Sequence, residues 1–506
     1  MKSKLLINIL ASLIAFASSV VINFFVSPYI IRHVGIEAFG FITLANNFII
    51  YIELLTVAFN SMGGRFVALE YHRLEKREAS EYFSTIFYSN LIMGCVLVAV
   101  CTIFILNMQK FIPISDFIQN DIKLSYFIML LNFVLSIVMS IYGSIYIISN
   151  TIYKSSKIQL ISNCIKVSTI YIFFSFFAPH VSYYLISIFA SNIYMQISNF
   201  LKKRELVKDI SCSWKYFSAK KLKTVVSSGI WNTVNRVGSV LSVNLDVFLV
   251  TTFMGVEITG IYGLVKIIPN FFYSITGTLV SVFFPNLVEL YAKNDYAGMT
   301  VELEKSMKIF ALVFNMPIVA FLAFGDIFFS FWVPEQNVVQ LYVLSSILLV
   351  SLTIVGPATL IYNLLTILNK LKLSSSLILC TGILGSSGVY LSLKYTDWGL
   401  IGVAAIPTLF NLIRNISFVI PYGALCLGKK WYYFHFISMR SLGSVIISVL
   451  SGVLYKSYIA INSWEMLIAA VFFVMLISFF VQYRFLLSGN ERIAFHTYVG
   501  KCRSIF

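Results

Sequence analysis

Residues Val225–Thr252 read VVSSGIWNTVNRVGSVLSVNLDVFLVTT. This stretch is long enough to cross a bilayer as an α-helix, which takes about 20 mostly apolar residues. It nevertheless contains an arginine and an aspartate, and an isolated charge at membrane depth costs at least ~2.5–3.5 kcal/mol. On a helix its polar residues fall along one side, namely Ser228, Asn232, Asn235, Arg236, Ser239 and Asp246. A polar stripe on a spanning helix faces protein or water rather than lipid, so we expect it to line a polar cavity that carries the function.

The composition indicates a membrane protein with many helical spans. Of the 506 residues, 59% are hydrophobic and 11% are charged, whereas about a quarter are charged in a soluble domain. The apolar runs are long and continuous, which favours helices over an outer-membrane barrel. The net charge of +16 would favour nucleic-acid binding in a soluble protein, but here we attribute it to membrane topology and expect no nucleic-acid partner. The seven cysteines and five histidines have no metal-ligand or disulfide spacing, so we expect no metal and no cofactor.

The apolar runs predict an all-α fold with about fourteen transmembrane helices. The first run follows Lys2 and Lys4 and resembles a signal peptide, but it continues through Val26 and is therefore interpreted as a span. Residues such as Pro28, Gly35 and Gly255 predict turns between spans. The predicted spans are 5–27, 38–60, 82–106, 122–150, 158–178, 181–201, 225–252, 258–282, 306–331, 338–365, 374–393, 400–427, 437–459 and 465–487.

The basic residues predict the topology. Of the 37 Lys and Arg residues, 28 fall on the side of the predicted N-terminus, 5 on the opposite side and 4 inside spans. Cytoplasmic loops carry the excess of Lys and Arg, so both termini are expected in the cytoplasm. The basic loop 202–223 would contribute most to this signal and would also attract anionic lipid head groups. No loop is long enough to form a soluble catalytic domain, so we do not expect an enzyme.

An internal repeat relates the two halves of the chain. A shift of 220 residues places Gly35–Gly40 (GIEAFG) on Gly255–Gly260 (GVEITG), and each copy is followed by a predicted charged amphipathic segment, 65–81 and 286–305. The same shift places the polar residues Asn8, Ser12 and Ser19 of the first span on the stripe of the seventh. Six spans separate the copies, so both halves have the same orientation, and transporters with parallel repeats bind substrate between them. We therefore predict a six-helix bundle over 1–220, a second over 221–430, and two further spans with a cytoplasmic tail over 431–506.

Two motifs resemble those of a known superfamily. They are Ser27–Gly40 (SPYIIRHVGIEAFG) and the segment Phe284–Leu287 (FPNL), which we interpret as a turn. The chain resembles the MOP superfamily, most closely its polysaccharide-transporter branch of Wzx-type flippases for O-antigen or capsule repeat units. Fourteen spans also resemble the lipid II flippase of the same superfamily.

The resemblance implies a V-shaped, MATE-like pair of bundles with alternating access in the bacterial cytoplasmic (inner) membrane. The implied cargo is an undecaprenyl-diphosphate-linked oligosaccharide, whose pyrophosphate is received by basic residues in the cavity. A proton or sodium gradient, or the membrane potential, would drive transport. The implied partners are membrane lipids, a glycan polymerase and a chain-length regulator.

Six charged side chains lie deep within the predicted spans, more than five residues from either end, and form the candidate site. They are Arg236, Arg414, Lys266 and Lys166, which we predict to bind phosphate, and Asp246 and Glu53. Arginine can bind phosphate with two parallel hydrogen bonds, and lysine acts as a point charge. The two acids either titrate and couple ions to transport or only neutralise neighbouring bases. The alternative for all six is a set of ion pairs that holds helices together. The stripe residues Asn232, Asn235, Ser239, Ser12 and Ser19 are predicted to line the cavity.

The sequence is compatible with three functions to different degrees. A lipid-linked oligosaccharide flippase fits the net positive charge inside the spans. A MATE-like exporter of organic cations would have the same architecture, but an acidic pocket would suit its cargo better. A membrane glycan polymerase or glycosyltransferase would be expected to have a large outer loop or a catalytic domain with paired carboxylates, and neither is present in the sequence.

Overall fold

The computed structural model describes residues 2–110, 119–368, 370–489 and 491–492, with the backbone alone for residues 2–6, 9–10, 13, 278, 281–282, 284–285 and 292. In these ranges all regular secondary structure is helical. The helices of the first half are α1 (Lys2–Val34), α2 (Ile36–His72), α3 (Lys76–Leu106), α4 (Gln119–Met139), α5 (Ser144–Ile148), α6 (Ile152–Phe176) and α7 (Val181–Leu206). Those of the second half are α8 (Ala219–Val243), α9 (Leu245–Met254), α10 (Val256–Ala292), α11 (Tyr296–Trp332), α12 (Val338–Ile367), α13 (Leu371–Tyr395), α14 (Gly399–Arg414), α15 (Ile420–Cys426), α16 (His435–Tyr458) and α17 (Trp464–Leu486).

The predicted spans correspond to these helices. Within the described ranges, 13 helical segments are long and apolar enough to cross a membrane. The helical fold is therefore confirmed, and the number of spans agrees closely with the sequence. The predicted span that this count omits is α7, whose inner face is polar. Its Asn192 side chain donates to Oδ1 of Asn132 on α4 at 2.7 Å and to the Ser136 hydroxyl at 2.8 Å, and Tyr146 donates to Asn199 at 2.8 Å. These buried bonds satisfy the polar groups of α7 inside the protein, which a membrane helix requires.

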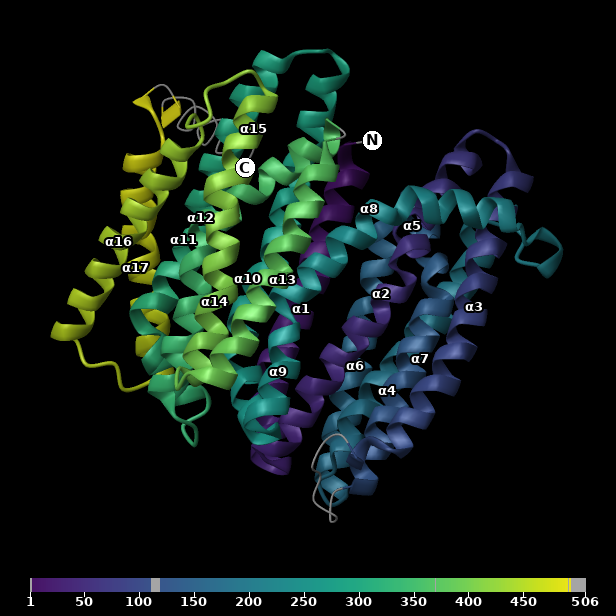
Figure 1. Ribbon diagram of the computed structural model, residues 1–506, viewed down its shortest axis with the longest axis horizontal. Coiled ribbons are helices and arrows are strands. Elements are labelled where there is room, and N and C mark those ends of the chain that lie inside the picture. The colour runs from purple at the N-terminus through teal and green to yellow at the C-terminus, as the bar shows by residue number, and fades with distance from the viewer. Residues whose placement is uncertain (1, 111–118, 369, 490, 493–506) are drawn as a thin grey trace. The chain divides into compact units, whose positions relative to one another are not determined.

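The helices form two compact units (Figure 1). Unit 1 comprises residues 1–240 and 247–263, and unit 2 comprises residues 241–246 and 264–506. The chain therefore passes between the units at three places, all close to α8, α9 and the start of α10. The predicted boundaries at 220 and 430 remain predictions.

The backbone repeats with the shift that the sequence indicates. Gly35 and Gly255, which precede α2 and α10, have φ values of 94° and 90°, a conformation that glycine adopts without strain. At the other ends of these helices Leu74 and Asn294 have φ values of 66° and 56°. Glu75 N–H donates to the Glu70 carbonyl, and Asp295 N–H donates to the Leu290 carbonyl, each at 3.0 Å. Equal geometry at positions 220 apart confirms the internal repeat.

Three details of the predicted turns and segment boundaries are wrong. Pro28 does not end the first span but lies inside α1. Phe284–Leu287 is part of α10 rather than a turn, and the side chains of Phe284 and Pro285 lie outside the described residues. The predicted amphipathic segments are not separate elements, because α2 and α10 are each 37 residues long. A helix of that length is about 55 Å long, so its polar end continues well past the apolar run.

The repeated glycines allow α2 and α10 to cross closely within unit 1. A Cβ atom on Gly40 would lie 2.1 Å from the Val256 carbonyl oxygen, and one on Gly260 would lie 2.2 Å from the Ile36 carbonyl oxygen. Residues 36 and 40 are the repeat equivalents of 256 and 260, so each copy of the motif makes the same contact with the other. One turn further, a Cβ on Gly263 would meet the side chain of its repeat equivalent, Thr43, at 2.4 Å.

The last two helices are fixed to unit 2 at three levels along α11. Lys308 Nζ of α11 donates to both carboxylate oxygens of Glu491, at 2.9 and 3.1 Å, and Asp326 near the other end of α11 pairs with Lys456. Between them Asn315 donates to the Ser441 hydroxyl at 2.7 Å. Helices α16 and α17 therefore form part of the core around α11 (Figure 1).

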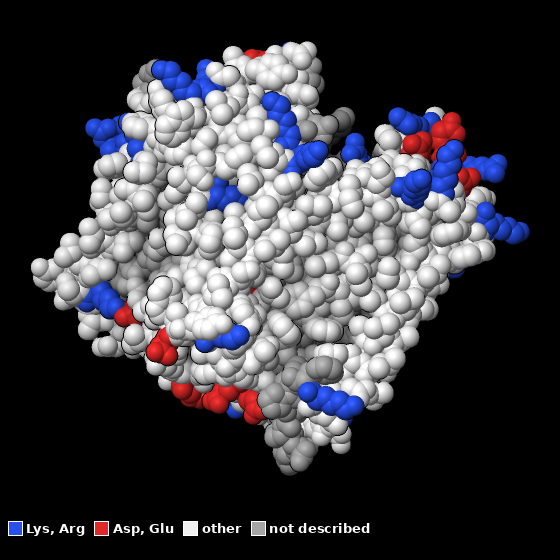
Figure 2. Space-filling model, viewed as in Figure 1, with Lys and Arg blue, Asp and Glu red and all other residues white. Residues whose placement is uncertain are grey.

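Basic side chains gather at one end of the helices within each unit. Figure 2 shows Lys and Arg concentrated at the end where α2 meets α3 in unit 1 and at the end where α15 is followed by α16 in unit 2. This distribution is the one on which the predicted cytoplasmic orientation of the termini depends. The orientation itself remains a prediction.

We predict that Gly40→Leu and Gly260→Leu destabilise the protein by at least about 1–3 kcal/mol, because the added side chain must displace backbone at the crossing. The midpoint of thermal unfolding of the purified protein measures this effect. Gly277→Ala on α10 is the matched control, since a Cβ there meets nothing within 4 Å. Equal unfolding midpoints for the wild type and both leucine variants would contradict the close backbone contact at Gly40 and Gly260.

Candidate functional site

Arg236 pairs with Glu53 inside unit 1. Its Nη2 atom lies 2.8 Å from Glu53 Oε2, joining α8 to α2, and the two side chains are 39% and 42% exposed. Asn232, one turn earlier on α8, donates to Ser61 of α2 at 3.4 Å. Gly229 permits this approach, because a Cβ there would lie 1.9 Å from the Ala58 carbonyl oxygen. Part of the predicted stripe therefore faces α2.

The other two stripe residues in the predicted site, Asn235 and Ser239, are half-buried on α8. Their predicted contact with a cavity remains a prediction.

Asp246 and Lys266 form a buried pair in unit 2. Lys266 Nζ lies 2.9 Å and 3.1 Å from the two carboxylate oxygens of Asp246, and each side chain is only 8% exposed. The pair lies where the predicted seventh span is interrupted at Asn244, between α8 and α9. Lys266 also donates to the Val243 carbonyl, which lies at the end of α8 where carbonyls lose their helical donors. The lysine therefore neutralises the aspartate and caps the interrupted helix.

Arg414 has no carboxylate partner among the residues that the structure describes. It lies at the end of α14, where Nη1 donates to the Thr381 hydroxyl at 3.1 Å and Nη2 donates to Asn411 Oδ1 at 2.6 Å. Its Nε is buried without a hydrogen-bond partner, and the Tyr362 side chain of α12 lies beside the guanidinium. A guanidinium carries five N–H donors in a fixed plane. Arg414 is therefore a partly buried cation with donor capacity to spare.

Lys166, Ser12 and Ser19 lie along the contact between α1 and α6. Lys166 Nζ donates to Asn23 Oδ1 at 2.8 Å and lies 5.3 Å from the centre of the Tyr184 ring. Ser12 lies 3.4 Å from the Ser156 hydroxyl, and Asn163 donates to Ser19 at 2.8 Å. These bonds join two packed helices. The structure thus places the predicted site residues in separate groups within the two units.

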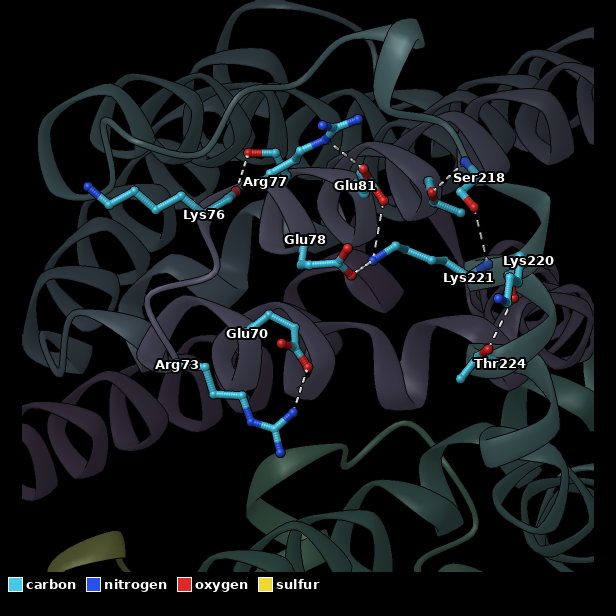
Figure 3. A network of polar contacts seen from close by, with 12 residues as sticks. Glu70, Arg73, Lys76, Arg77, Glu78, Glu81, Ser218, Lys220, Lys221 and Thr224 are labelled. Carbon is cyan, nitrogen blue, oxygen red and sulfur yellow. Dashed lines mark hydrogen bonds and ion pairs between the residues drawn. The ribbon is translucent and has the colours of Figure 1, made fainter.

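The linker before α8 is docked on α3, which the sequence did not reveal. The Ser84 hydroxyl donates to the Ser211 carbonyl at 3.2 Å, and the Ser218 N–H donates to the Thr85 hydroxyl at 3.0 Å. Figure 3 shows Lys221 at the start of α8 reaching towards Glu78 and Glu81 of α3. The predicted basic loop 202–223 is therefore an ordered part of unit 1, in addition to its predicted topogenic role.

The sequence analysis also missed the surroundings of Arg414. Asn411, Arg414 and Asn415 have the spacing of neighbours on a helix face, and this signal could have identified them as a group. Thr381 and Tyr362 come from α13 and α12, and no pattern in one sequence links them to Arg414.

The comparisons with known proteins agree with this architecture. Residues 29–328, more than half of the chain, match the model of a family described as polysaccharide biosynthesis protein. The chain belongs to the polysaccharide biosynthesis protein family. The chain is similar to the uncharacterized membrane protein EpsK of Bacillus subtilis (strain 168). The two sequences are 25% identical over 472 residues, and the alignment covers 92% of each chain.

Solved structures show which fold this polysaccharide biosynthesis protein shares. An inward-facing multidrug resistance MATE family transporter of the MOP superfamily is similar with a TM-score of 0.69 and 13% identity, over 81% of this chain and 94% of that one. A MOP superfamily transporter from Pyrococcus furiosus, described by the reverse polarity of its binding pocket, has a TM-score of 0.65 and 13% identity over 84% and 96%. The predicted polysaccharide family is confirmed, and the chain shares the fold of MOP superfamily transporters. The family and the 13 candidate spans identify a multi-pass membrane protein of polysaccharide biosynthesis, and its fold is the one that MATE transporters have.

We predict that Asp246→Asn destabilises the protein by about 3–5 kcal/mol, because it leaves the buried Lys266 ammonium without its counter-charge. Glu53→Gln should cost less than about 1 kcal/mol, since the pair that it breaks is well exposed. Unfolding of both purified variants in denaturant measures the difference. The double variant Asp246→Asn/Lys266→Met should regain most of the lost stability. Equal losses for Asp246→Asn and Glu53→Gln would show that burial does not distinguish the pairs.

Proposed function

We propose that this protein moves an oligosaccharide linked to undecaprenyl diphosphate across the bacterial cytoplasmic membrane by alternating access. The cargo would be a repeat unit of O-antigen, capsule or a related polysaccharide. Membership of the polysaccharide biosynthesis protein family supports the glycan class, and the MATE-like fold supports transport. In this proposal the diphosphate binds basic side chains within the membrane while the lipid chain stays in the bilayer.

The observation that carries the proposal is the uncompensated charge of Arg414. Glu53 neutralises Arg236 and Asp246 neutralises Lys266, so of the four basic residues predicted deep inside spans, Arg414 and Lys166 have no carboxylate partner among the described residues. Lys166 is half-buried and has an amide and an aromatic ring beside it. A cation at membrane depth is costly without a counter-charge, and a diphosphate head group would supply one. Arginine suits this task because its planar fork matches phosphate geometry.

The two acids differ in how well they suit ion coupling. Glu53 is 42% exposed and makes a single-point contact with Arg236, so a proton or sodium ion can reach it and compete with the guanidinium. Asp246 is 8% exposed and holds Lys266 with both oxygens. We therefore assign coupling to Glu53 and a structural role to Asp246. Arg236, when released from Glu53, would become a second phosphate ligand.

A second candidate is export of small molecules, because structural neighbours include multidrug resistance MATE transporters. An organic cation would need acidic groups free to receive it. In the described parts of the spans the two acids Glu53 and Asp246 are already paired with bases. The arrangement therefore favours the anionic lipid-linked cargo.

Mass spectrometry of the lipids that copurify with the protein tests the proposal directly. The protein should retain a polyprenyl diphosphate carrying sugars, and Arg414→Ala should retain much less of it. Polyprenyl lipids at the level of a bulk-lipid background, together with normal surface polysaccharide in a strain lacking the protein, would refute the proposed cargo.

We predict that Arg414→Ala lowers surface polysaccharide at least about tenfold in a strain that depends on this protein, because a charge-assisted bond to phosphate is lost. Arg414→Lys should retain part of the activity, since lysine keeps the charge but not the fork. Arg440→Ala is the matched control, because that arginine is exposed and its Cζ atom lies 4.0 Å from the centre of the Phe436 ring. Wild-type polysaccharide with Arg414→Ala, at equal protein level in the membrane, would refute the role of Arg414.

A further inference from the structure

The helix that carries Arg414 contains a π-turn directly after it. α14 ends at Arg414, residues Asn415–Val419 form the π-turn, and α15 begins at Ile420. The Ile420 N–H donates to the Asn415 carbonyl, five residues back, whereas in an α-helix it would donate to the Ile416 carbonyl. Single π-turns inside α-helices are rare and often lie at functional sites.

Pro421 leaves one carbonyl of this turn without a donor from its own helix. Proline has no backbone N–H, so residue 421 cannot donate to either of the carbonyls that precede it by four or five positions. In the observed register the Ile420 N–H is used by Asn415, so the Ile416 carbonyl has no donor four or five residues ahead of it in its own helix. In a continuous α-helix the Ile416 carbonyl would accept from the Ile420 N–H. A carbonyl without a donor is strongly unfavourable at membrane depth, so the π register depends on an outside donor to Ile416.

His435 supplies that partner to Ile416. Its Nε2 lies 2.8 Å from the Ile416 carbonyl oxygen, and because a carbonyl can only accept, Nε2 carries the hydrogen and donates. His435 is the first residue of α16, and the preceding Phe434 is fully buried, which anchors the ring beside the turn. This bond favours the π register specifically, since in a continuous α-helix the Ile416 carbonyl would already accept from the Ile420 N–H.

The register of the turn also sets the direction of Arg414. Asn415, the first residue of the π-turn, donates to the Asn411 carbonyl at 2.8 Å and to Asn411 Oδ1 at 3.0 Å. The same Oδ1 accepts from Arg414 Nη2 at 2.6 Å. Loss of the extra residue in the turn would rotate the helix on one side of it by about 100° relative to the other. Asn411 lies on the same side of the turn as Arg414 and would move with it, so the contact of the guanidinium that would be lost is the one with Thr381 on α13.

We propose that His435 is a positioning residue, which holds the π-turn Asn415–Val419 in register and thereby orients Arg414 towards the phosphate of the cargo. This inference rests on the proposed function, in which Arg414 binds the diphosphate. His435 itself contacts no cargo. It acts through the Ile416 carbonyl and the Asn411–Asn415 pair.

The test combines His435 with Pro421. His435→Ala should lower surface polysaccharide about tenfold, because the Ile416 carbonyl loses its donor. His435→Gln should retain most of the activity, since the side-chain amide can also donate. Pro421→Ala restores an N–H that can bond Ile416 within the helix, so the double variant Pro421→Ala/His435→Ala should recover to within about twofold of Pro421→Ala alone. His72→Ala, at an exposed histidine, is the control and should match the wild type.

Two further measurements separate positioning from folding. Purified His435→Ala should bind inorganic diphosphate about tenfold more weakly than the wild type, because Arg414 is no longer held in its direction, while a cooperative unfolding transition shows that the variant is still folded. Wild-type activity in His435→Ala, or equal impairment of His435→Ala and the double variant, would overturn the inference and leave the proposed function intact. Normal surface polysaccharide in cells without the protein would instead refute the proposed function.

Discussion

The close crossing of α2 and α10 is the constraint on which the rest of the arrangement depends. Gly40 and Gly260 bring two backbones into contact, and each glycine meets the carbonyl that precedes its counterpart by four residues. Only a residue without a Cβ fits there. The two helices occupy equivalent positions in the repeat, so equivalent glycines form both sides of the contact. The long helices α2 and α10 extend from this point in both copies.

The charged groups within the spans differ in how deeply they are buried and in their partners. The pair that is almost fully buried, Asp246 with Lys266, caps an interrupted helix and has a structural character. The pair that remains accessible, Arg236 with Glu53, can exchange partners because water screens the separated charges. Arg414 has neither arrangement and depends on neutral side chains and on the helix geometry that the π-turn provides. A net charge summed over the spans could not distinguish these three situations.

Much of the fold could be predicted because membrane helices are specified by local composition. The apolar runs gave the helices, the 220-residue shift gave the repeat, and Gly35 and Gly255 were correctly placed at turns. The extent of α2 and α10 was not predictable from hydropathy, since their polar ends leave the apolar run while the backbone stays helical. The partners of Arg236 and Lys266 are 183 and 20 residues away, and a single sequence contains no signal for such pairing. The interruption of the seventh span and the π-turn were not predicted for a related reason, because each is stabilised by a side chain from another helix.

The docking of the linker on α3 determines which segment of the chain connects the two units. Residues 207–218 are bonded to the side chains of Ser80, Ser84 and Thr85 and belong to unit 1. The covalent joint between the units is therefore not this polar segment but the helical stretch from 240 to 264. A gene divided within the linker would yield two fragments whose junction lies inside one folded body, so coexpressed halves would have to rebuild unit 1 from both pieces. Severing the peptide there would leave the mechanical connection between the units unbroken.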